Sequence, residues 1–384
     1  MDYDLGAEAG ALRNRLRDLM RDNLPERYLG AFSDNPDDLE VAQRFCKVLA
    51  AEHLLTLAWP EEYGGAGGSV WDQTVVREEM WAHYEPRGAQ YMGLNWVGPA
   101  IMRHGTAEQK AKYLPPIAAG ETIWCQGFSE PDAGSDLASL RTAAVADGDG
   151  WRLNGQKVWT SYALMADHCV VAARTGTPES RHAGITLFLV PMDRPGLTAV
   201  PIPSQLGPHH LNELFLDDVR VEPGETILPV DGGWKVMRDA LAYERVGIAR
   251  YARCDRLLTE TRSELGADFA AAPPALLARY ARAAVHARTA RLLSYRTIAA
   301  QATGEIVDSD AAAARVAVTR CDQEVGGVLM EMIGSDAFDG RTQPDAPLHG
   351  GIEDHYRYSQ AATVAAGTLE MQLTLVARDA LERA

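Results

Sequence analysis

The sequence predicts two helical regions that flank a central antiparallel β domain, so that helices and strands are segregated along the chain instead of alternating. Apolar residues recur at helical spacing up to about residue 120 and again from residue 233. Residues 123 to 221 instead contain short strand-like segments between turns. A length of 384 residues is too great for one ordinary core. We therefore expect domains at residues 1–121, 122–227 and 228–384.

The first region is predicted to be helical because its apolar residues lie three and four positions apart. The pattern is clearest in Leu12, Leu16 and Leu19, and in Phe45, Val48 and Leu49. The cluster PEEYGGAGGS at 60–69 marks a turn between helices.

The middle domain is predicted from four β-rich segments: TAAVADGDGWRLNGQKVWTS, HCVVAART, GITLFLVPM and NELFLDDVRV. Within the first of them, DGDG and LNG predict hairpin turns. Long helical patterns return after residue 233, interrupted by AAPPALL at 271–277 and by GSDAFDGRTQPDAPLHGG at 334–351. A β unit between two helical ones creates a junction, and clefts at such junctions are where ligands usually bind.

Composition excludes several classes of partner. The net charge is −16 and no long basic run is present, which argues against nucleic acid. No apolar run approaches the roughly 18 residues that a membrane span requires, so we expect a cytoplasmic protein. The five cysteines are scattered singly, without the spacing of a metal site. We expect buried free thiols, no disulfide framework and no metal.

Two segments carry the predicted chemistry. In WCQGFSEPDAGSDLASL, residues 124–140, Gly134 and Ser135 leave backbone N–H groups open to a phosphate. In NGQKVWTS, residues 154–161, Trp159 stands beside two hydroxyls on a strand. Alone, the first segment is more typical of a surface loop and the tryptophan of a core residue. Together they suit a planar heteroaromatic cofactor, with an aromatic wall and hydrogen-bonding groups at its margin.

The chain resembles the acyl-CoA dehydrogenases in these two segments and in four more: PEEYGGAGGS, GTAEQKAKYLPPIAAGE, FLDDVRV and AAGTLEMQ. The resemblance implies the acyl-CoA dehydrogenase fold, with an N-terminal α-helical domain, a central antiparallel β domain and a C-terminal four-helix bundle. It also implies FAD as cofactor and the α,β-dehydrogenation of an acyl thioester, carried on coenzyme A or on an acyl-carrier protein. Electron-transferring flavoprotein would be the electron acceptor.

The resemblance assigns the flavin to residues of both segments and to one near the C-terminus. These residues are Gln126, Phe128, Ser129, Gly134, Ser135, Trp159, Thr160, Ser161 and Thr368. Ser129 and Ser161 stand where the family usually has threonine. Either hydroxyl donates and accepts the same hydrogen bonds, so we expect function to be retained.

The catalytic base is expected at Glu244. Most members of the family have a glutamate directly before a Gly-Thr pair near the C-terminus, but this chain has Ala366 there. Other members place the base on the first long helix of the C-terminal bundle, before an arginine, as Glu244-Arg245 would be. The alternative is an ordinary surface ion pair, against which stand apolar neighbours at 241, 242, 246 and 248. Arg245 and Ser135 would contact substrate, and the N–H of Ala366 would help to stabilise the carbonyl oxygen.

In the family, a neighbouring subunit covers each flavin, and the residues for this task are altered here. Arg262 is present, but Leu265 stands in the position of a phenylalanine. Glu331 and Ser335 replace a glutamine and a glycine, which brings a negative charge and a side chain toward a pyrophosphate. This pattern fits the actinobacterial α2β2 members that often act on steroid side-chain thioesters. A homo-oligomer that tolerates the changes remains the alternative.

Two other functions stay open. Flavin monooxygenases and oxidases share this fold, and a fold alone does not fix the chemistry. A non-catalytic partner subunit would carry no flavin, although Glu244 argues against that reading.

Overall fold

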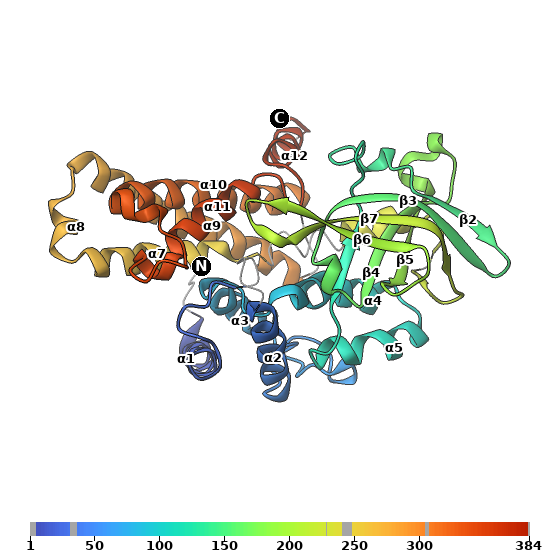
Figure 1. Cartoon of the computed structure of the whole chain (residues 1–384), viewed down its shortest axis with the longest axis horizontal. Coiled ribbons are helices and arrows are strands. Elements are labelled where there is room, and N and C mark those ends of the chain that lie inside the picture. Colours follow the sequence, from blue (N-terminus) through green and yellow to red (C-terminus); the bar gives the residue numbers. More distant parts are fainter. Residues whose placement is uncertain (1–4, 31–36, 228, 240–247, 304–306, 383–384) are drawn as a thin grey trace. The chain divides into compact units, whose positions relative to one another are not determined.

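The computed structural model describes residues 5–30, 37–227, 229–239, 248–303 and 307–382. The chain separates into two compact units. One comprises Met1–Ser33, Ser69–Pro86 and Arg245–Ala384, and the other comprises Asp34–Gly68 and Arg87–Glu244. The first unit is helical, and the second combines helices with a β-sheet (Figure 1). The N-terminal helices are thus divided between the units, and the domain limits at 121 and 227 stay predictions.

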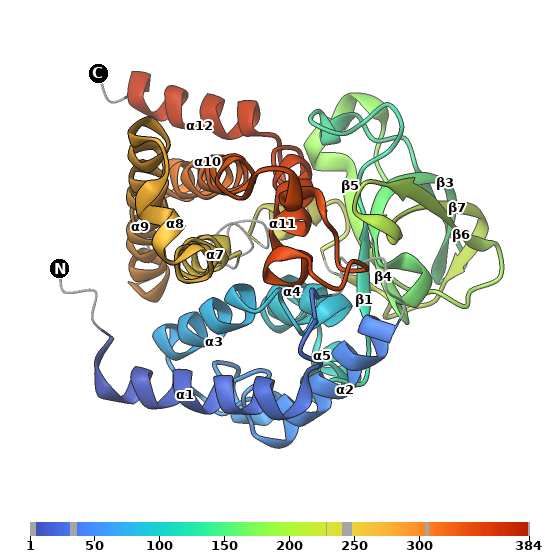
Figure 2. The same ribbon diagram turned by 60° about the vertical axis from the view of Figure 1, so that its left-hand side comes forward.

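The helical unit is built around a long central helix, α10 (Asp308–Ile333). It packs against α7, α9, α11 and α12, and Figure 2 shows α9, α10 and α12 next to one another. The two predicted interruptions are confirmed, because one separates α8 from α9 and the other separates α10 from α11. The remaining helices of the unit are α1 (Gly6–Asn23), α3 (Val70–Ala82), α7 (Arg250–Leu265), α8 (Ala267–Ala271), α9 (Pro274–Thr303), α11 (Gly351–Ala361) and α12 (Leu369–Glu382).

Buried carboxylates on α3 explain why this N-terminal helix belongs to the helical unit. Glu78 and Glu79 are both 2% exposed. Glu79 accepts from Arg17 of α1 at 2.8 Å, and Glu78 accepts from Arg291 of α9 at 3.0 Å. Only the carboxylates of these pairs are buried, since the Arg17 and Arg291 side chains are 55% and 40% exposed, and Arg13 contacts both glutamates as well. These pairs therefore fix α1 and α9 to α3.

The second unit contains the predicted β domain, whose sheet has the order β6-β7-β3-β2-β4-β5-β8. Most neighbours are antiparallel, but β4 pairs in parallel with both β1 and β2. Helices α2 (Asp37–Ala51), α4 (Gly98–His104) and α5 (Ala107–Ala118) belong to this unit. The strands are β1 (Trp124–Gly127), β2 (Ala143–Asp147), β3 (Gly150–Ser161), β4 (His168–Arg174), β5 (Ile185–Pro191), β6 (Leu197–Ser204), β7 (Gly207–Val221) and β8 (Thr226–Ile227).

Of the two predicted hairpin turns, one is confirmed and one is wrong. DGDG joins β2 to β3, with Asp147 opposite Gly150. LNG lies inside β3, where the register against β7 shifts between Leu153 and Gly155. Gly155 has φ +155°, and a Cβ there would approach the Thr142 side chain to 2.5 Å. The glycine therefore serves a β-bulge and a close approach of two strands instead of a turn.

The core of the β unit consists of apolar residues from alternate strand positions, including Leu153, Phe188, Leu214 and Val219, each fully buried. All five cysteines are buried free thiols, as predicted. Within the described part of the chain, no helix combines the length and apolarity that crossing a membrane would need.

Candidate functional site

The loop after β1 is shaped by Glu130. Its backbone pairs with that of Ala133 at 3.0 and 3.1 Å, which closes a tight turn. Its carboxylate accepts from the N–H groups of Arg141 at 2.7 Å and Thr142 at 2.9 Å. Beyond the turn, Gly134 is exposed, and a Cβ on it would meet no atom within 4 Å. The small residue is not required by packing within the chain, and it leaves the backbone open to a ligand.

A buried lysine ties the end of β3 to this loop. Lys157 is 0% exposed, and its Nζ donates to Glu130 Oε1 at 2.7 Å and to the Phe128 carbonyl at 3.1 Å. The N–H of Val158 donates to the Ser129 carbonyl at 2.9 Å. Burial lowers the pKa of Lys157 to about 8, against the opposing effect of Glu130. The ion pair is therefore charged at neutral pH and fixes both segments to each other.

Trp159 is turned outward from this well-packed strand. Its indole is 59% exposed, whereas Lys157 and Thr160 are 0% exposed. The register of β3 shifts between these two neighbours, and Trp159 has φ +60°, a left-handed conformation. Such a conformation costs on the order of 1–3 kcal/mol in a residue with a side chain, and it is typical of functional sites. The interpretation of Trp159 as an ordinary core residue is wrong.

The other predicted site residues of this unit lie on β1, in the loop after it and on β3. Phe128 is buried and packs edge-on against Trp96, with ring centroids 5.5 Å apart. Gln126 Oε1 and Thr160 Oγ1 are buried polar atoms without a hydrogen-bond partner among the residues that the structure describes. Ser129 is half-buried and Ser135 is exposed. Unsatisfied acceptors and hydroxyls beside an exposed indole are what a polar, planar ligand would use.

Ser161 ends β3 beside a histidine that the sequence reasoning missed. Its Oγ lies 3.3 Å from His210 Nε2, on the neighbouring strand β7. Burial lowers the pKa of His210 to about 4, so its imidazole is neutral at pH 7. The only signal in the sequence is a histidine just before the predicted strand segment NELFLDDVRV, which does not reveal its partner.

In the helical unit, the turn before α12 contains Ala366 and Thr368. Ala366 adopts φ +55°, a left-handed conformation that is uncommon outside glycine. Buried Arg315 donates to the neighbouring Ala365 carbonyl at 3.0 Å and helps to hold the turn. The Thr368 hydroxyl accepts from the N–H of Met371 at 3.3 Å, at the start of α12. Their contacts with cofactor and substrate stay predictions, and Glu244 and Arg245 lie outside the described residues.

The residues expected to face a neighbouring flavin have contacts within the chain. The Arg262 guanidinium lies 5.4 Å from the ring centroid of Phe269, on α8. Glu331 forms an ion pair with Arg279. Ser335 is exposed, and its hydroxyl contacts Asp336 at 3.1 Å.

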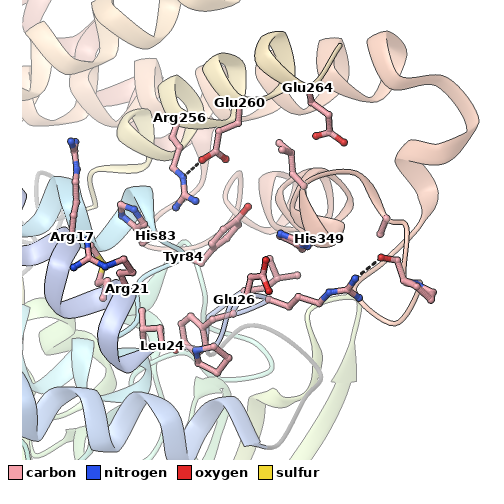
Figure 3. A pocket seen from close by; sticks show the side chains of 18 of the residues that line it. Arg17, Arg21, Leu24, Glu26, His83, Tyr84, Arg256, Glu260, Glu264 and His349 are labelled. Atoms are coloured by element: carbon pink, nitrogen blue, oxygen red, sulfur yellow. Dashed lines mark hydrogen bonds and ion pairs between the residues drawn. The ribbon is translucent and has the colours of Figure 1, made fainter. Parts of the chain in front are cut away.

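The helical unit also contains a cavity of about 710 Å³, between the end of α1, the loop after it, α7 and residues 344–349 (Figure 3). Some of its charged side chains have partners. Arg256 contacts Glu260 at 2.6 Å, and Arg27 donates to the Pro344 carbonyl. Among the predicted site residues that the structure describes, none lines this cavity. Its size alone does not make it the site of the chemistry.

Three buried side chains in the same unit, those of Cys254, Asp322 and His355, are of the types that bind metal ions. Cys254 Sγ lies 3.4 Å from Asp322 Oδ1 and 3.8 Å from His355 Nε2. Asp322 already accepts from Arg250. Burial, and then the Arg253 charge, lowers the pKa of His355 to about 3. A metal ion would meet two buried guanidinium groups, so the absence of a metal site stays our prediction.

The order of a helical region, a β domain and a second helical region agrees with the predicted fold class, and the comparisons with known proteins identify the family. The chain matches the acyl-CoA dehydrogenase N-terminal domain over residues 6–121, the middle domain over 125–219 and the C-terminal domain over 231–381. It is 32% identical to the acyl-CoA dehydrogenase IpdE1 of Mycobacterium tuberculosis over 96% of each chain. The chain therefore belongs to the acyl-CoA dehydrogenase family, whose members depend on FAD and oxidise CH–CH groups.

Solved structures give the same family. A structure titled Tcur3481-Tcur3483 steroid ACAD is 31% identical, with a TM-score of 0.91 over 100% of this chain and 99% of its own. The ChsE4-ChsE5 complex from Mycobacterium tuberculosis is also 31% identical, with a TM-score of 0.86 and the same coverage. The predicted family and fold class are confirmed.

Proposed function

We propose that this chain uses FAD to remove hydrogens from the α and β carbons of an acyl-CoA thioester. The observation that carries the proposal is the outward indole of Trp159, held in a left-handed conformation beside a loop that the Lys157–Glu130 pair anchors. An aromatic face in that setting suits a flat, electron-poor ring. Bound FAD would supply the acceptor for the hydride that leaves the β carbon.

The flavin-holding residues have separate tasks in this proposal. The backbone at Gly134 and the Ser135 hydroxyl would hold the pyrophosphate, because both are exposed and unobstructed. Trp159 would cover one face of the ring. Thr160 and Ser161, with Gln126, Phe128, Ser129 and Thr368, would supply polar and apolar contacts at its margin.

Glu244 would abstract the α proton. Ala366 carries a methyl group and cannot accept a proton, so a carboxylate must come from another position. A site that excludes water would raise the pKa of Glu244, while Arg245 would limit the rise. As charge develops on the thioester oxygen, the N–H of Ala366 would donate to it. This N–H belongs to the main chain, so it is present whichever side chain stands at position 366.

The neighbour-facing residues support the proposed assembly, and the related structures support the proposed substrate class. Arg262 and Glu331 have partners within the chain, and related structures are titled as a steroid ACAD and as a complex of two subunits. We therefore propose an α2β2 enzyme for steroid side-chain or branched acyl-CoA. It would act in the cytoplasm and pass electrons to electron-transferring flavoprotein. A homo-oligomer is the alternative.

Anaerobic titration of the purified flavoprotein with short, branched, aromatic and steroid acyl-CoA thioesters tests the reaction. We expect the flavin to bleach in the absence of oxygen. Full reduction by dithionite gives the absorbance change against which this bleaching is scaled. Rapid oxygen consumption once air is admitted with substrate would favour the oxidase alternative, and a flavin that no acyl-CoA reduces but that reacts rapidly with oxygen after dithionite reduction would favour the monooxygenase alternative. A protein that contains no flavin, alone or with its partner, would favour the non-catalytic alternative.

A further inference from the structure

The end of β3 is held against β7 by strand pairing and by hydrogen bonds to backbone carbonyls. Ser161 lies opposite Leu211, and Thr160 lies opposite Asn212. The Asn212 side chain donates to the Thr160 carbonyl at 3.0 Å, and the N–H of Tyr162 donates to the His210 carbonyl at 2.9 Å. The backbone on both sides of Ser161 is therefore held against one strand.

The same strand also reaches the Ser161 side chain. His210 is 9% exposed, and its Nε2 lies 3.3 Å from Ser161 Oγ. The Tyr162 ring stands edge-on to the imidazole, with centroids 5.2 Å apart. His210 is thus a fixed, buried neighbour of a half-buried hydroxyl, and burial alone accounts for its lowered pKa.

The orientation of a serine hydroxyl depends on a neighbouring side chain more than that of a threonine hydroxyl does. A threonine at this position would have a restricted χ1 angle, because two heavy atoms branch from its Cβ. Ser161 lacks that restraint, and its hydroxyl would otherwise rotate among three staggered positions. A hydrogen bond between Ser161 Oγ and the buried imidazole of His210 would supply this restraint from outside the residue.

We infer that His210 is a positioning residue for the flavin, which fixes the hydroxyl of Ser161 so that this hydroxyl donates its own proton to the flavin ring. The inference rests on the proposed function. A neutral imidazole has one donor and one acceptor nitrogen. With the proton on Nε2, His210 donates to Ser161 Oγ, and the serine proton is left for a second acceptor. His210 itself has no contact with substrate in this account.

A matched pair of variants tests the inference. His210→Gln keeps a donor on a flexible side chain, whereas His210→Met has similar length and no donor. The measurements are the dissociation constant of FAD and the midpoint potential of the bound flavin. We expect His210→Met to weaken FAD binding about fivefold, the factor that corresponds to a typical net hydrogen bond. We expect His210→Gln to stay within about twofold of the parent.

The decisive comparison is the effect of His210→Met in the parent and in the Ser161→Ala variant. If His210 acts through Ser161, adding His210→Met to Ser161→Ala should change neither the dissociation constant nor the potential further. Multiplicative losses in the double variant, or a parent-like His210→Met, would overturn the inference while leaving the flavin site intact. A parent that binds no FAD, alone or with its partner, would overturn the proposed function and this inference with it. If His210→Met does not fold, His210→Phe repeats the comparison with a ring of similar shape.

Discussion

The two regions that matter for the cofactor use the same kind of interaction in opposite settings. Lys157 and Glu130 form a buried ion pair, at 0% and 8% side-chain exposure, which anchors the loop that we propose holds the chain's own flavin. Arg279 and Glu331 form an ion pair at 43% and 53% exposure, on a surface expected to serve a neighbour's flavin. The first pair organises a site. The second pairs two exposed charges within the chain, and under the proposed assembly this surface serves no neighbour's flavin.

The difference in burial determines how much each ion pair contributes to the stability of the fold. Breaking a buried pair costs about 3–5 kcal/mol, because one charge is left without compensation. An exposed pair contributes about 0–1 kcal/mol. The comparison therefore predicts large effects from changes in the loop and small ones from changes on the neighbour-facing surface.

The largest effect is expected from Ser135→Tyr, which places a ring beside the open backbone at Gly134. The added volume would occupy the space that the pyrophosphate needs, so the purified protein should be colourless. The measurement is the flavin absorbance per chain. A full complement of FAD in this variant would show that the loop does not hold the cofactor.

Lys157→Met should lower the free energy of unfolding by about 3–5 kcal/mol, because Glu130 is left charged and buried. Arg279→Met, the matched change in the exposed pair, should cost less than about 1 kcal/mol. Urea unfolding of both variants gives the two values. Equal costs would remove the distinction between the two regions.

Glu244→Gln should keep the fold and the flavin but slow reduction by substrate at least about 100-fold, the lower end for loss of a general base. Glu264→Gln, an exposed change on α7, is the control and should reduce its flavin at the parent rate. Anaerobic stopped-flow absorbance measures both. A Glu244→Gln variant as fast as the parent would assign the base to another residue.

A smaller effect is expected from pH. The pKa of His210 falls from 6.5 to about 4 on burial, so below pH 6.5 the unfolded chain takes up a proton that the folded chain does not. The free energy of unfolding should therefore decrease from pH 6.5 toward pH 4, with no contribution from this residue above. At pH 5 the loss is roughly 2 kcal/mol. Urea unfolding at pH 7.5 and pH 5 should show this loss in the parent but not in His210→Gln.

Much of the fold could be predicted because helices and strands are segregated, and each leaves its own periodicity in the sequence. The SEPDAGSD and KVWTS segments could be singled out because glycine, hydroxyls and tryptophan have distinctive chemistry. The role of Gly155 was misjudged, since a bulge and a hairpin favour the same residues. Lys157 and His210 are not predicted because their partners are distant in sequence: the fold of the loop after β1 brings Glu130 to Lys157, and pairing of β3 with β7 brings Ser161 to His210.

Mass and flavin content test the central comparison most directly, with the chain purified alone and after co-expression with a related subunit that has the usual arginine, phenylalanine, glutamine and paired glycines. Alone, the chain should hold FAD weakly. With the partner, we expect a heterotetramer with two flavins, because only half of its junctions combine two intact halves, and ligand binding then stabilises that assembly. A homotetramer of this chain with four tightly bound FAD molecules would contradict the account, because the altered surface would then serve a neighbour's flavin after all.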